Sequence, residues 1–219
     1  MRERTERELL PPSGRPLAAR AAVAAGLVVL VLGAVFWHGT TPSAVDRAVA
    51  RPLTDYYWHG HAVAVLHWAD LGSPGPTFVL AGLVLVLGLA RRRVRGALLL
   101  LLALGIASGV TEYVLKPLVH RTKDGVLAYP SGHSTGVFTL AFVVAILLIG
   151  PRRSSTGAVV RVLAAVASVV MAVVVAAALV ASDFHYATDT VGGAGVALAS
   201  VLSVSLALDA LIDRTRTAR

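Results

Sequence analysis

The sequence predicts an all-α, polytopic membrane protein: a bundle of six transmembrane helices with a site at its extracytoplasmic face. The chain has 219 residues, of which 56% are hydrophobic and 15% charged, unlike the composition of soluble domains. The apolar residues form six runs, most of them close to the roughly 20 residues that cross a bilayer as a helix. These runs cover 21–37, 77–90, 97–115, 134–150, 162–181 and about 190–212. Because hydrocarbon cannot satisfy backbone polar groups, we expect each run to be helical.

The distribution of basic residues predicts the orientation of this bundle. If the N-terminus is cytoplasmic, fifteen of the 20 Lys and Arg residues fall in cytoplasmic segments and five in outer segments. This is the asymmetry that the positive-inside rule requires, so we expect a multi-pass protein of the cell membrane with both termini in the cytoplasm. The net charge of +8 is spread between apolar runs, which argues against a nucleic-acid partner.

The runs also set the expected domain limits. We expect a mobile cytoplasmic tail at 1–18, a six-span membrane domain at 19–213 and a cytoplasmic C-terminal tail at 214–219. Charge mixed with proline and glycine in the first tail opposes folding. The first run resembles a signal peptide in position, but "TTPSAVD" is a poor cleavage site, so we expect a retained anchor.

Small residues four apart occur inside two of the runs. Gly105 with Gly109, and Gly195 with Ala199, would each lie on one face of a helix. We expect these pairs to mark close packing between helices.

The outer segment 38–76 contains "LTDYYWHGHAVAVLHWADLG", whose Tyr and Trp residues predict a helix lying at the outer membrane interface. The alternative is a metal site formed by His59, His61, His67 and Asp70. Residues two apart point to nearly opposite faces of a helix, which argues against it. The chain also lacks cysteine, which excludes thiol nucleophiles, disulfides and cysteine-ligated metals. We therefore predict no metal and no cofactor.

Three polar segments at outward turns need a functional explanation, because ionisable residues at span ends are costly. They read "EYVLKPLVHRTKDG" (112–125), "YPSGHSTG" (129–136) and "SDFHYATD" (182–189). The topology places all three at the same membrane face. They can therefore converge on one site.

The second of these segments has the composition of an anion-binding site. Ser131, Gly132 and His133 open the fourth run, where unpaired backbone N–H groups and the helix dipole attract negative charge. Glycine at this point allows a phosphate to approach the backbone closely. The alternative is an ordinary helix start, with Ser131 as the N-cap.

The third segment pairs a histidine with a carboxylate. If a helix has begun at His185, Asp189 lies one turn further along the same face and can orient the imidazole. That arrangement would make His185 a nucleophile or a base. The alternative is a surface ion pair without function.

The first segment supplies positive charge through Lys116, Arg121 and Lys123. Phosphoryl transfer depends chiefly on positioning and electrostatic stabilisation, so these cations suit a phosphate. The alternative is that they are residues whose charged ends reach the lipid headgroups.

Together, these segments resemble the type 2 phosphatidic acid phosphatase family, the membrane relatives of vanadium haloperoxidases. That family carries Lys, six residues and Arg-Pro, then Pro-Ser-Gly-His, then Ser-Arg, five residues, His, three residues and Asp. The second motif is complete at 130–133, and His185 and Asp189 match the end of the third. The resemblance covers roughly residues 44–210 and agrees in motif order and in position relative to the spans.

The sequence departs from the family pattern at two places. Lys123 and Asp124 stand where the family has Arg-Pro, although Arg121 matches an arginine often found two positions earlier. Ala178 and Leu179 stand where the family has Ser-Arg. The loss of an arginine that grips phosphate removes bidentate hydrogen bonding, which can be worth ~3 kcal/mol.

The resemblance implies a metal-independent lipid phosphatase that forms a phosphohistidine. If the family roles apply to the matching residues, His185 is the nucleophile, Asp189 orients it and His133 is the acid. The residues that hold the phosphoryl oxygens are then Lys116, Arg121, Lys123, Ser131 and Gly132.

The implied substrate is an outer-leaflet lipid phosphate or diphosphate: phosphatidic acid, phosphatidylglycerol phosphate or a polyprenyl diphosphate. Two alternatives remain open. One is a non-catalytic lipid-phosphate binder or transporter that kept the fold, which Leu179 makes plausible. The other is a phosphotransferase that passes the phosphoryl group to an acceptor other than water.

Overall fold

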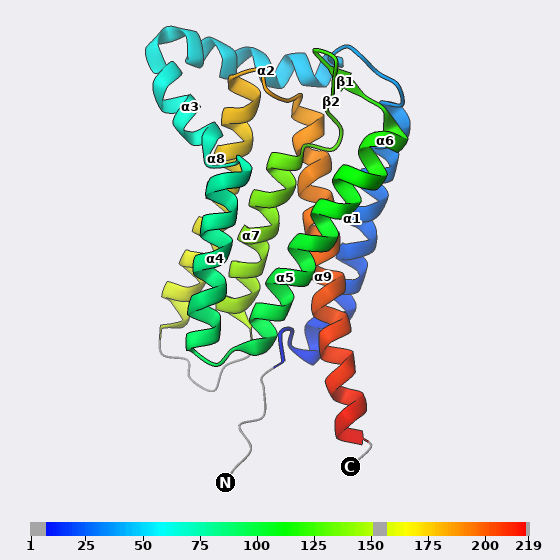
Figure 1. Cartoon of the computed structure of the whole chain (residues 1–219), viewed down its shortest axis with the longest axis vertical. Coiled ribbons are helices and arrows are strands. Elements are labelled where there is room, and N and C mark those ends of the chain that lie inside the picture. Colours follow the sequence, from blue (N-terminus) through cyan, green and yellow to red (C-terminus); the bar gives the residue numbers. More distant parts are fainter. Residues whose placement is uncertain (1–7, 151–156, 218–219) are drawn as a thin grey trace.

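A computed structural model describes residues 8–150 and 157–217 as a bundle of long helices that run in alternating directions (Figure 1). The helices of the bundle are α1 (Arg15–Val35), α4 (Pro74–Ala90), α5 (Val94–Gly109), α7 (Gly132–Ile149), α8 (Ala158–Ala181) and α9 (Ala187–Thr217). The start of α1 and the end of α9 lie at one end of the bundle, and the start of α7 lies at the other. We call these the terminal end and the motif end.

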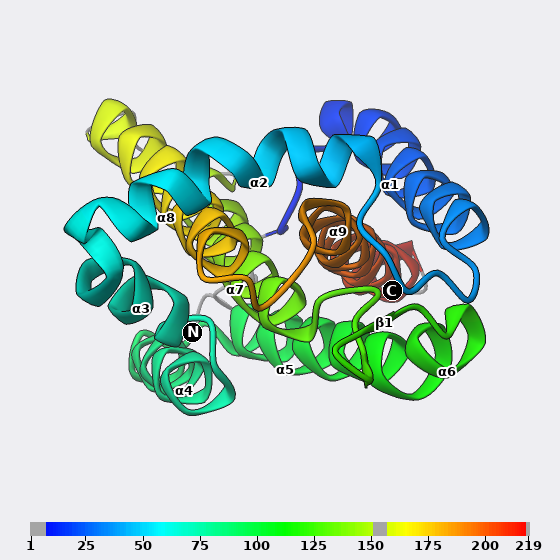
Figure 2. The same ribbon diagram turned by 90° about the horizontal axis from the view of Figure 1, so that it is seen from above.

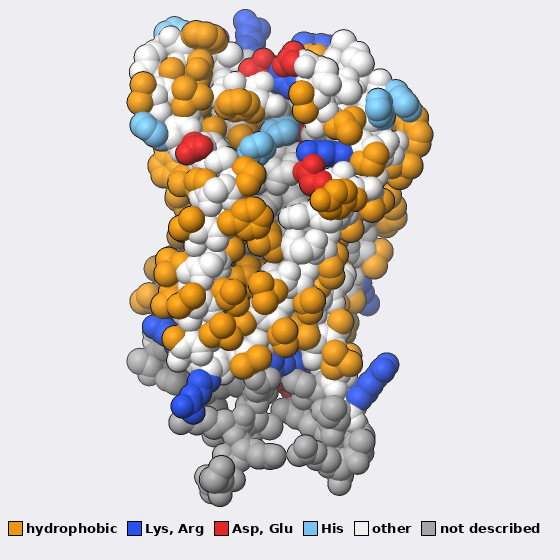
Figure 3. Space-filling model, viewed as in Figure 1, with side chains coloured by type: hydrophobic (Ala, Val, Ile, Leu, Met, Phe, Trp, Pro, Cys, Tyr) orange, Lys and Arg blue, Asp and Glu red, His pale blue; other side chains and the backbone are white. Residues whose placement is uncertain are grey.

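The helices confirm an all-α membrane protein. Five of them are long and apolar enough to cross a membrane, and the bent pair formed by 44–70 and 74–90 brings the number to six if it is one span. The predicted six spans fall within this range. Large apolar side chains are exposed along the bundle and cover the middle of the face in Figure 3. Charged side chains gather toward both ends of this face, and histidines gather toward the motif end. Such a band is expected where lipid replaces water.

The motif end carries the outer segment as a bent helix. A capping box at Ser43 and Asp46 starts α2 (Ala44–Tyr56), and this helix crosses the motif end (Figure 2). The chain kinks at η2 (Tyr57–His61), where Gly60 has a φ of 94°, and continues as α3 (Ala62–Asp70). The segment is therefore helical as predicted, but the helix is broken in two.

Short elements lead from α5 to the second polar segment. The helix continues through the π-helical segment η3 (Val110–Leu115) into α6 (Lys116–Val119). A small antiparallel hairpin then follows, made of β1 (Thr122–Lys123) and β2 (Val126–Leu127). Asp124 and Gly125 form its two-residue loop, both with positive φ, which is the geometry that Asp-Gly loops favour.

Small residues let the central helices approach closely at some of the expected positions. A Cβ at residue 195 would lie 2.7 Å from Val29 Cγ2, so glycine is needed where α9 crosses α1. Gly105 and Gly109 do not have this role, because a Cβ at either position would meet no described atom within 4 Å. The expectation of close packing is thus confirmed for Gly195 and wrong for the "GIASG" pair, whose helix face is open.

The terminal end is closed by a buried carboxylate. Asp209 of α9 is fully buried and accepts hydrogen bonds from the backbone N–H groups of Leu9 (3.0 Å) and Leu10 (2.9 Å) and from Arg95 Nη2 (3.1 Å). Arg15 Nη2 lies 3.8 Å from its other oxygen. The segment just before α1 is therefore attached to α5 and α9 at this end.

The chain limits differ from the expected tails. The 3₁₀ helix η1 (Pro12–Gly14) and α1 already include residues 12–18, and Leu9 is buried. Within the expected tail 1–18, residues 1–7 lie outside the described residues. Helix α9 extends into the expected tail 214–219, of which 218–219 are not described.

Candidate active site

Two histidines from separate polar segments meet at the motif end. His133 lies in the first turn of α7, and His185 lies in the turn between α8 and α9. His133 Nδ1 is 3.3 Å from His185 Nε2, and the two rings meet edge to face. The structure thus joins the second and third motifs as the topology predicted.

His185 is held as a neutral imidazole. Burial, together with the positive charges of its neighbours His133, Lys116 and Lys123, lowers the pKa of His185 to about 3. Its Nδ1 atom is buried and has no hydrogen-bond partner among the described residues. If the Nδ1 atom carries the ring proton, the Nε2 lone pair points toward His133 and is available as a nucleophile.

The start of α7 is packed too tightly for larger residues. Ser131 is fully buried, and its hydroxyl accepts a hydrogen bond from the Ser134 N–H at 3.2 Å. A Cβ at residue 193 of α9 would lie 2.6 Å from the Ser131 carbonyl oxygen. Ser131 therefore acts as the N-cap in this structure. Its hydroxyl is occupied in capping, which differs from the expected contact with a phosphoryl oxygen.

Lys116 lies beside the start of α7 together with a carboxylate. Lys116 Nζ forms an ion pair with Glu112 Oε2 at 2.8 Å. A side chain at residue 132 would collide with Glu112 Oε1, so this carboxylate lies against Gly132. The hydroxyls of Thr111 and Thr135, 3.1 Å apart and fully buried, attach η3 to α7. The predicted anion-binding site at the start of α7 therefore has the carboxylate of Glu112 beside it.

Lys123 is directed to the site by the hairpin. Its Nζ lies 3.0 Å from Asp183 and 3.3 Å from Asp124. Burial opposes the charged form, but these carboxylates more than offset it and raise the pKa of Lys123. Lys123 therefore stays a cation, and its charge acts on His185.

Arg121 has a different position from the one expected. Its side chain is fully buried between the rings of Phe36 (3.9 Å from the guanidinium carbon to the ring centre) and Tyr186 (4.5 Å). Its Nη2 donates to Asp46 Oδ2 at 2.8 Å, and its Nη1 donates to Asp189 Oδ1 at 2.6 Å. The guanidinium is thus held by two carboxylates and is not directed at the histidine pair.

Asp189 belongs to this buried group. It is fully buried, and its second oxygen accepts a hydrogen bond from the Tyr186 N–H at 3.3 Å. Arg121 Nη1 also donates to Thr188 Oγ1 (2.6 Å), which in turn donates to Asp46 Oδ1 (2.8 Å). Asp189 is therefore paired with Arg121 here, and the expected pairing with His185 is not seen.

Leu179, which stands where the family has an arginine, fills an apolar cluster. It is 1% exposed and packs with Val65 and Ala69 of α3 and with Val175 of α8. The carbonyl of Leu179 accepts hydrogen bonds from the N–H groups of Phe184 and His185. The backbone carbonyl of Leu179 therefore supports the turn that carries His185, while its side chain packs against α3.

The sequence reasoning missed Asp46, which is 1% exposed and joins α2 to the site. The signal "SAVD" at 43–46 is a capping box that predicts a helix start, but it does not predict a buried ion pair. The hairpin was also missed, although "TKDGVL" at 122–127 contains the Asp-Gly turn signal.

The histidines of the outer segment do not converge on one another. His59 Nδ1 contacts the Asp55 carbonyl at 2.6 Å, and His61 Nδ1 contacts the Tyr56 carbonyl at 3.0 Å. Within the described residues, no group of three or more His, Cys, Asp or Glu side chains is arranged to hold a metal ion.

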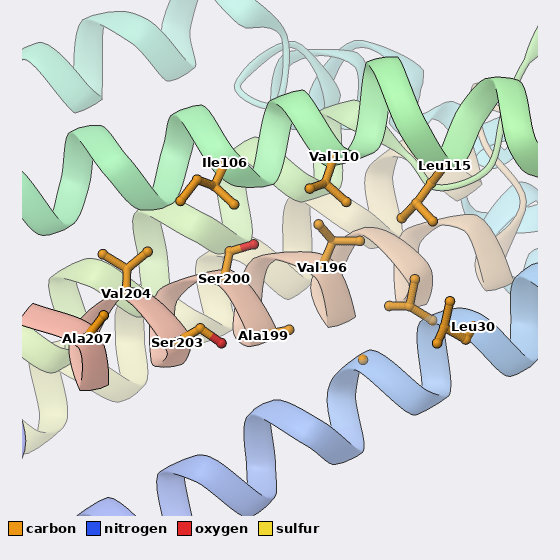
Figure 4. A pocket seen from close by; sticks show the side chains of 12 residues that line it. Leu30, Ile106, Val110, Leu115, Val196, Ala199, Ser200, Ser203, Val204 and Ala207 are labelled. Atoms are coloured by element: carbon orange, nitrogen blue, oxygen red, sulfur yellow. The ribbon is translucent and has the colours of Figure 1, made fainter.

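A separate apolar groove runs along the bundle between α1, α5 and α9 (Figure 4). It has a volume of about 530 Å³, and its lining includes Leu30, Ile106, Val110 and Val204. Neither His133 nor His185 lines it. The groove is therefore distinct from the histidine pair.

Comparison with known protein families gives a match over part of the chain. Residues 118–212 match the PAP2 superfamily, a range that includes His133, His185 and Asp189 and begins two positions after Lys116. Searches of curated proteins and of solved structures give no significant match. The chain is therefore similar over these residues to the PAP2 superfamily, whose members are phosphatases.

Proposed function

We propose that this membrane protein hydrolyses an outer-leaflet lipid phosphate or diphosphate, without a metal ion, through a phosphohistidine on His185. The observation that carries the proposal is the contact between His133 Nδ1 and His185 Nε2 at 3.3 Å. It places a neutral imidazole beside a second imidazole, with Lys116 and Lys123 close enough to act electrostatically on His185. Nucleophile, acid and positive charge are the parts that metal-free phosphoryl transfer requires.

The chemistry divides into two steps. In the first, His185 Nε2 attacks phosphorus, the bond from phosphorus to the leaving oxygen breaks, and protonated His133 gives its proton to that oxygen. In the second, water attacks the phosphohistidine, His133 accepts the proton from the water and inorganic phosphate leaves. The two ring nitrogens must separate for the substrate, because phosphorus has to reach His185 Nε2 while the leaving oxygen faces His133.

The phosphoryl oxygens would be held by a smaller set of groups than the sequence suggested. We assign this role to Lys116 and Lys123, which act electrostatically on His185, and to the N–H groups of Gly132 and His133. Arg121 is occupied by two carboxylates. Glu112 and Asp183 pair with the two lysines, so a substrate must compete with carboxylates for both. The proposed enzyme would therefore bind phosphate more weakly than a site with two free arginines.

The outward orientation and the lipid substrate are part of this proposal. The segments on the side of the terminal end hold fifteen basic residues and those on the other side hold five, which favours a cytoplasmic terminal end. The motif end would then face outward. At that depth, a phosphorylated lipid headgroup reaches the histidine pair while its chains stay in the bilayer. Phosphatidic acid, phosphatidylglycerol phosphate and a polyprenyl diphosphate all combine a phosphorylated headgroup with hydrocarbon chains.

The alternative function is a non-catalytic lipid-phosphate binder or transporter. Leu179 favours it, because this side chain is packed in an apolar cluster and leaves the site without its family arginine. A phosphotransferase is the other alternative, and it would yield a phosphorylated acceptor in place of free phosphate.

The test is phosphate release from these three lipids by the purified protein in detergent with excess chelator. His185→Ala is measured beside the wild type, with His67→Ala as a control on α3 that lies outside the histidine pair. We expect chelator-resistant release that is lost in His185→Ala and kept in His67→Ala. Lipid binding without release from any lipid would instead identify the binder.

A further inference from the structure

We infer that Asp46 is a positioning residue for the reaction: it gives Arg121 a second counter-charge, which frees Asp189 to turn and accept the Nδ1–H of His185. The inference rests on the proposed phosphate site at His185. It assigns a role to α2, the outer helix that contributes no residue to the three motifs.

The first support is the number of hydrogen bonds that Asp46 accepts. Oδ1 accepts from the Thr188 N–H (2.9 Å) and from Thr188 Oγ1 (2.8 Å). Oδ2 accepts from the Ser43 N–H (2.9 Å), from Ser43 Oγ (2.8 Å) and from Arg121 Nη2 (2.8 Å). A buried carboxylate with this many donors is fixed as an anion, so it can balance Arg121 alone.

The second support is that one arginine serves two buried carboxylates. Arg121 pairs with Asp46 and with Asp189, and all three side chains are at most 1% exposed. A buried guanidinium needs one counter-charge, and the second carboxylate is in surplus. Asp189 makes fewer hydrogen bonds than Asp46 among the described residues, since it contacts Arg121 and the Tyr186 N–H. Asp189 is therefore the carboxylate that can leave at the lower cost.

The third support is an unmet donor on His185, close to Asp189 in the sequence. His185 lies four residues before Asp189, in the turn that leads into α9, and its buried Nδ1 has no partner in the part of the chain that the structure describes. A phosphohistidine on Nε2 makes the ring cationic and strengthens the need for an acceptor at Nδ1. A phosphoryl group on His185 thus supplies the free energy that moves Asp189.

The experiment compares Asp46→Asn with Asp209→Asn. Both replace a fully buried, arginine-paired aspartate by its neutral isostere, at opposite ends of the bundle. In Asp46→Asn, Asp189 becomes the sole counter-charge of Arg121 and stays there. We expect kcat for phosphate release to fall at least about tenfold, with KM nearly unchanged. This loss should be smaller than the ~10⁴-fold loss that follows when an aspartate that directly orients a catalytic histidine is neutralised. Asp209→Asn should lose thermal stability but keep kcat.

A second measurement does not depend on activity. The protein is labelled with ¹⁵N-histidine, His185→Gln assigns the signal of His185, and inorganic phosphate is added as the probe. We expect the Nδ1–H signal of His185 to move downfield in the wild type and in Asp209→Asn, but not in Asp46→Asn. If the wild type hydrolyses no lipid yet shows this Asp46-dependent shift, the proposed hydrolysis is wrong, but the role of Asp46 in positioning Asp189 at the phosphate site stands. An equal shift in Asp46→Asn, or none in the wild type, overturns the inference, as does an unchanged kcat in Asp46→Asn.

Discussion

Asp46 and Asp209 are buried carboxylates at opposite ends of the bundle, and both accept hydrogen bonds from backbone N–H groups and from arginine. At the terminal end, Arg95 and Arg15 both lie near Asp209, and Arg15 also pairs with Asp213 and Glu8. At the motif end, one arginine serves two carboxylates. Asp209 is held in place by two backbone N–H groups and by Arg95. At the motif end, in contrast, two carboxylates share one arginine, so one of them can move.

The largest effect should come from removing Arg121, the arginine that Asp46 and Asp189 share at the motif end. Arg121→Met leaves Asp46 and Asp189 buried without a counter-charge, which costs about 3–5 kcal/mol of stability for one broken buried pair. Arg95→Met should cost less, because Asp209 keeps two N–H donors and lies near Arg15. Thermal denaturation of both variants in the same detergent measures the difference. An equal loss of stability in both would contradict the distinction between the two ends.

Packing against the start of α7 gives the next largest effect. Gly193→Ala places a methyl group 2.6 Å from the Ser131 carbonyl and 3.0 Å from the Thr135 nitrogen. Backbone atoms cannot move aside cheaply, so we expect a loss of about 1–3 kcal/mol and a lower kcat as His133 is displaced. Gly105→Ala is the control, because its methyl group meets no described atom within 4 Å. This control should be neutral or up to about 1 kcal/mol more stable. Equal behaviour of the two variants would refute the close approach.

Acid should destabilise the motif end through His185. Its pKa is lowered to about 3 in the folded protein from about 6.5 in the unfolded chain. Between these values the unfolded state binds more protons, so the free energy of unfolding rises with pH across this window, by at most about 1.4 kcal/mol per pH unit. In His185→Gln this contribution should disappear. Denaturation midpoints of both proteins from pH 4 to 8 measure it, and parallel curves would show that His185 is not buried as a neutral ring.

The smallest effect concerns the carboxylate beside Gly132. Glu112→Gln removes the partner of Lys116, and a partly exposed pair is worth about 0.2–1 kcal/mol. We therefore expect KM for a lipid phosphate to fall up to about fivefold, because the lysine is free for the substrate. Asp55→Asn, on α2 and outside the site, is the control and should leave KM unchanged. A higher KM in Glu112→Gln would mean that Glu112 helps to bind the substrate.

The sequence predicted the helices well because lipid imposes one rule on every apolar run. Hydrocarbon satisfies no backbone group, so "VVMAVVVAAALVA" at 169–181 forms a helix despite its β-branched residues. The same rule predicted that 130–133 and 182–189 meet at one end, since outward turns share a membrane face. The prediction was weakest where the chain leaves hydrocarbon, as at the kink of Gly60 and in the hairpin at Asp124 and Gly125.

Site residues were predictable where a motif sets local geometry and not where a charge has several partners in reach. His133 and His185 meet as expected, because each is fixed next to a helix end. The prediction for Arg121 failed to foresee its two carboxylates, since Asp46 lies 75 residues away in the sequence. An arginine side chain is long, and its direction depends on which anion the fold brings near it.

By itself, the sequence determined the all-α membrane fold, the common face of the three polar segments and the histidines that meet there, because burial in lipid and fixed spacing leave few alternatives. Only the tertiary structure decided that Arg121 and Asp189 are paired with Asp46, that Leu179 is covered by α3 and that Glu112 lies against Gly132. Ion pairs depend on distances of a few ångströms between groups remote in the chain, and no local pattern encodes those distances.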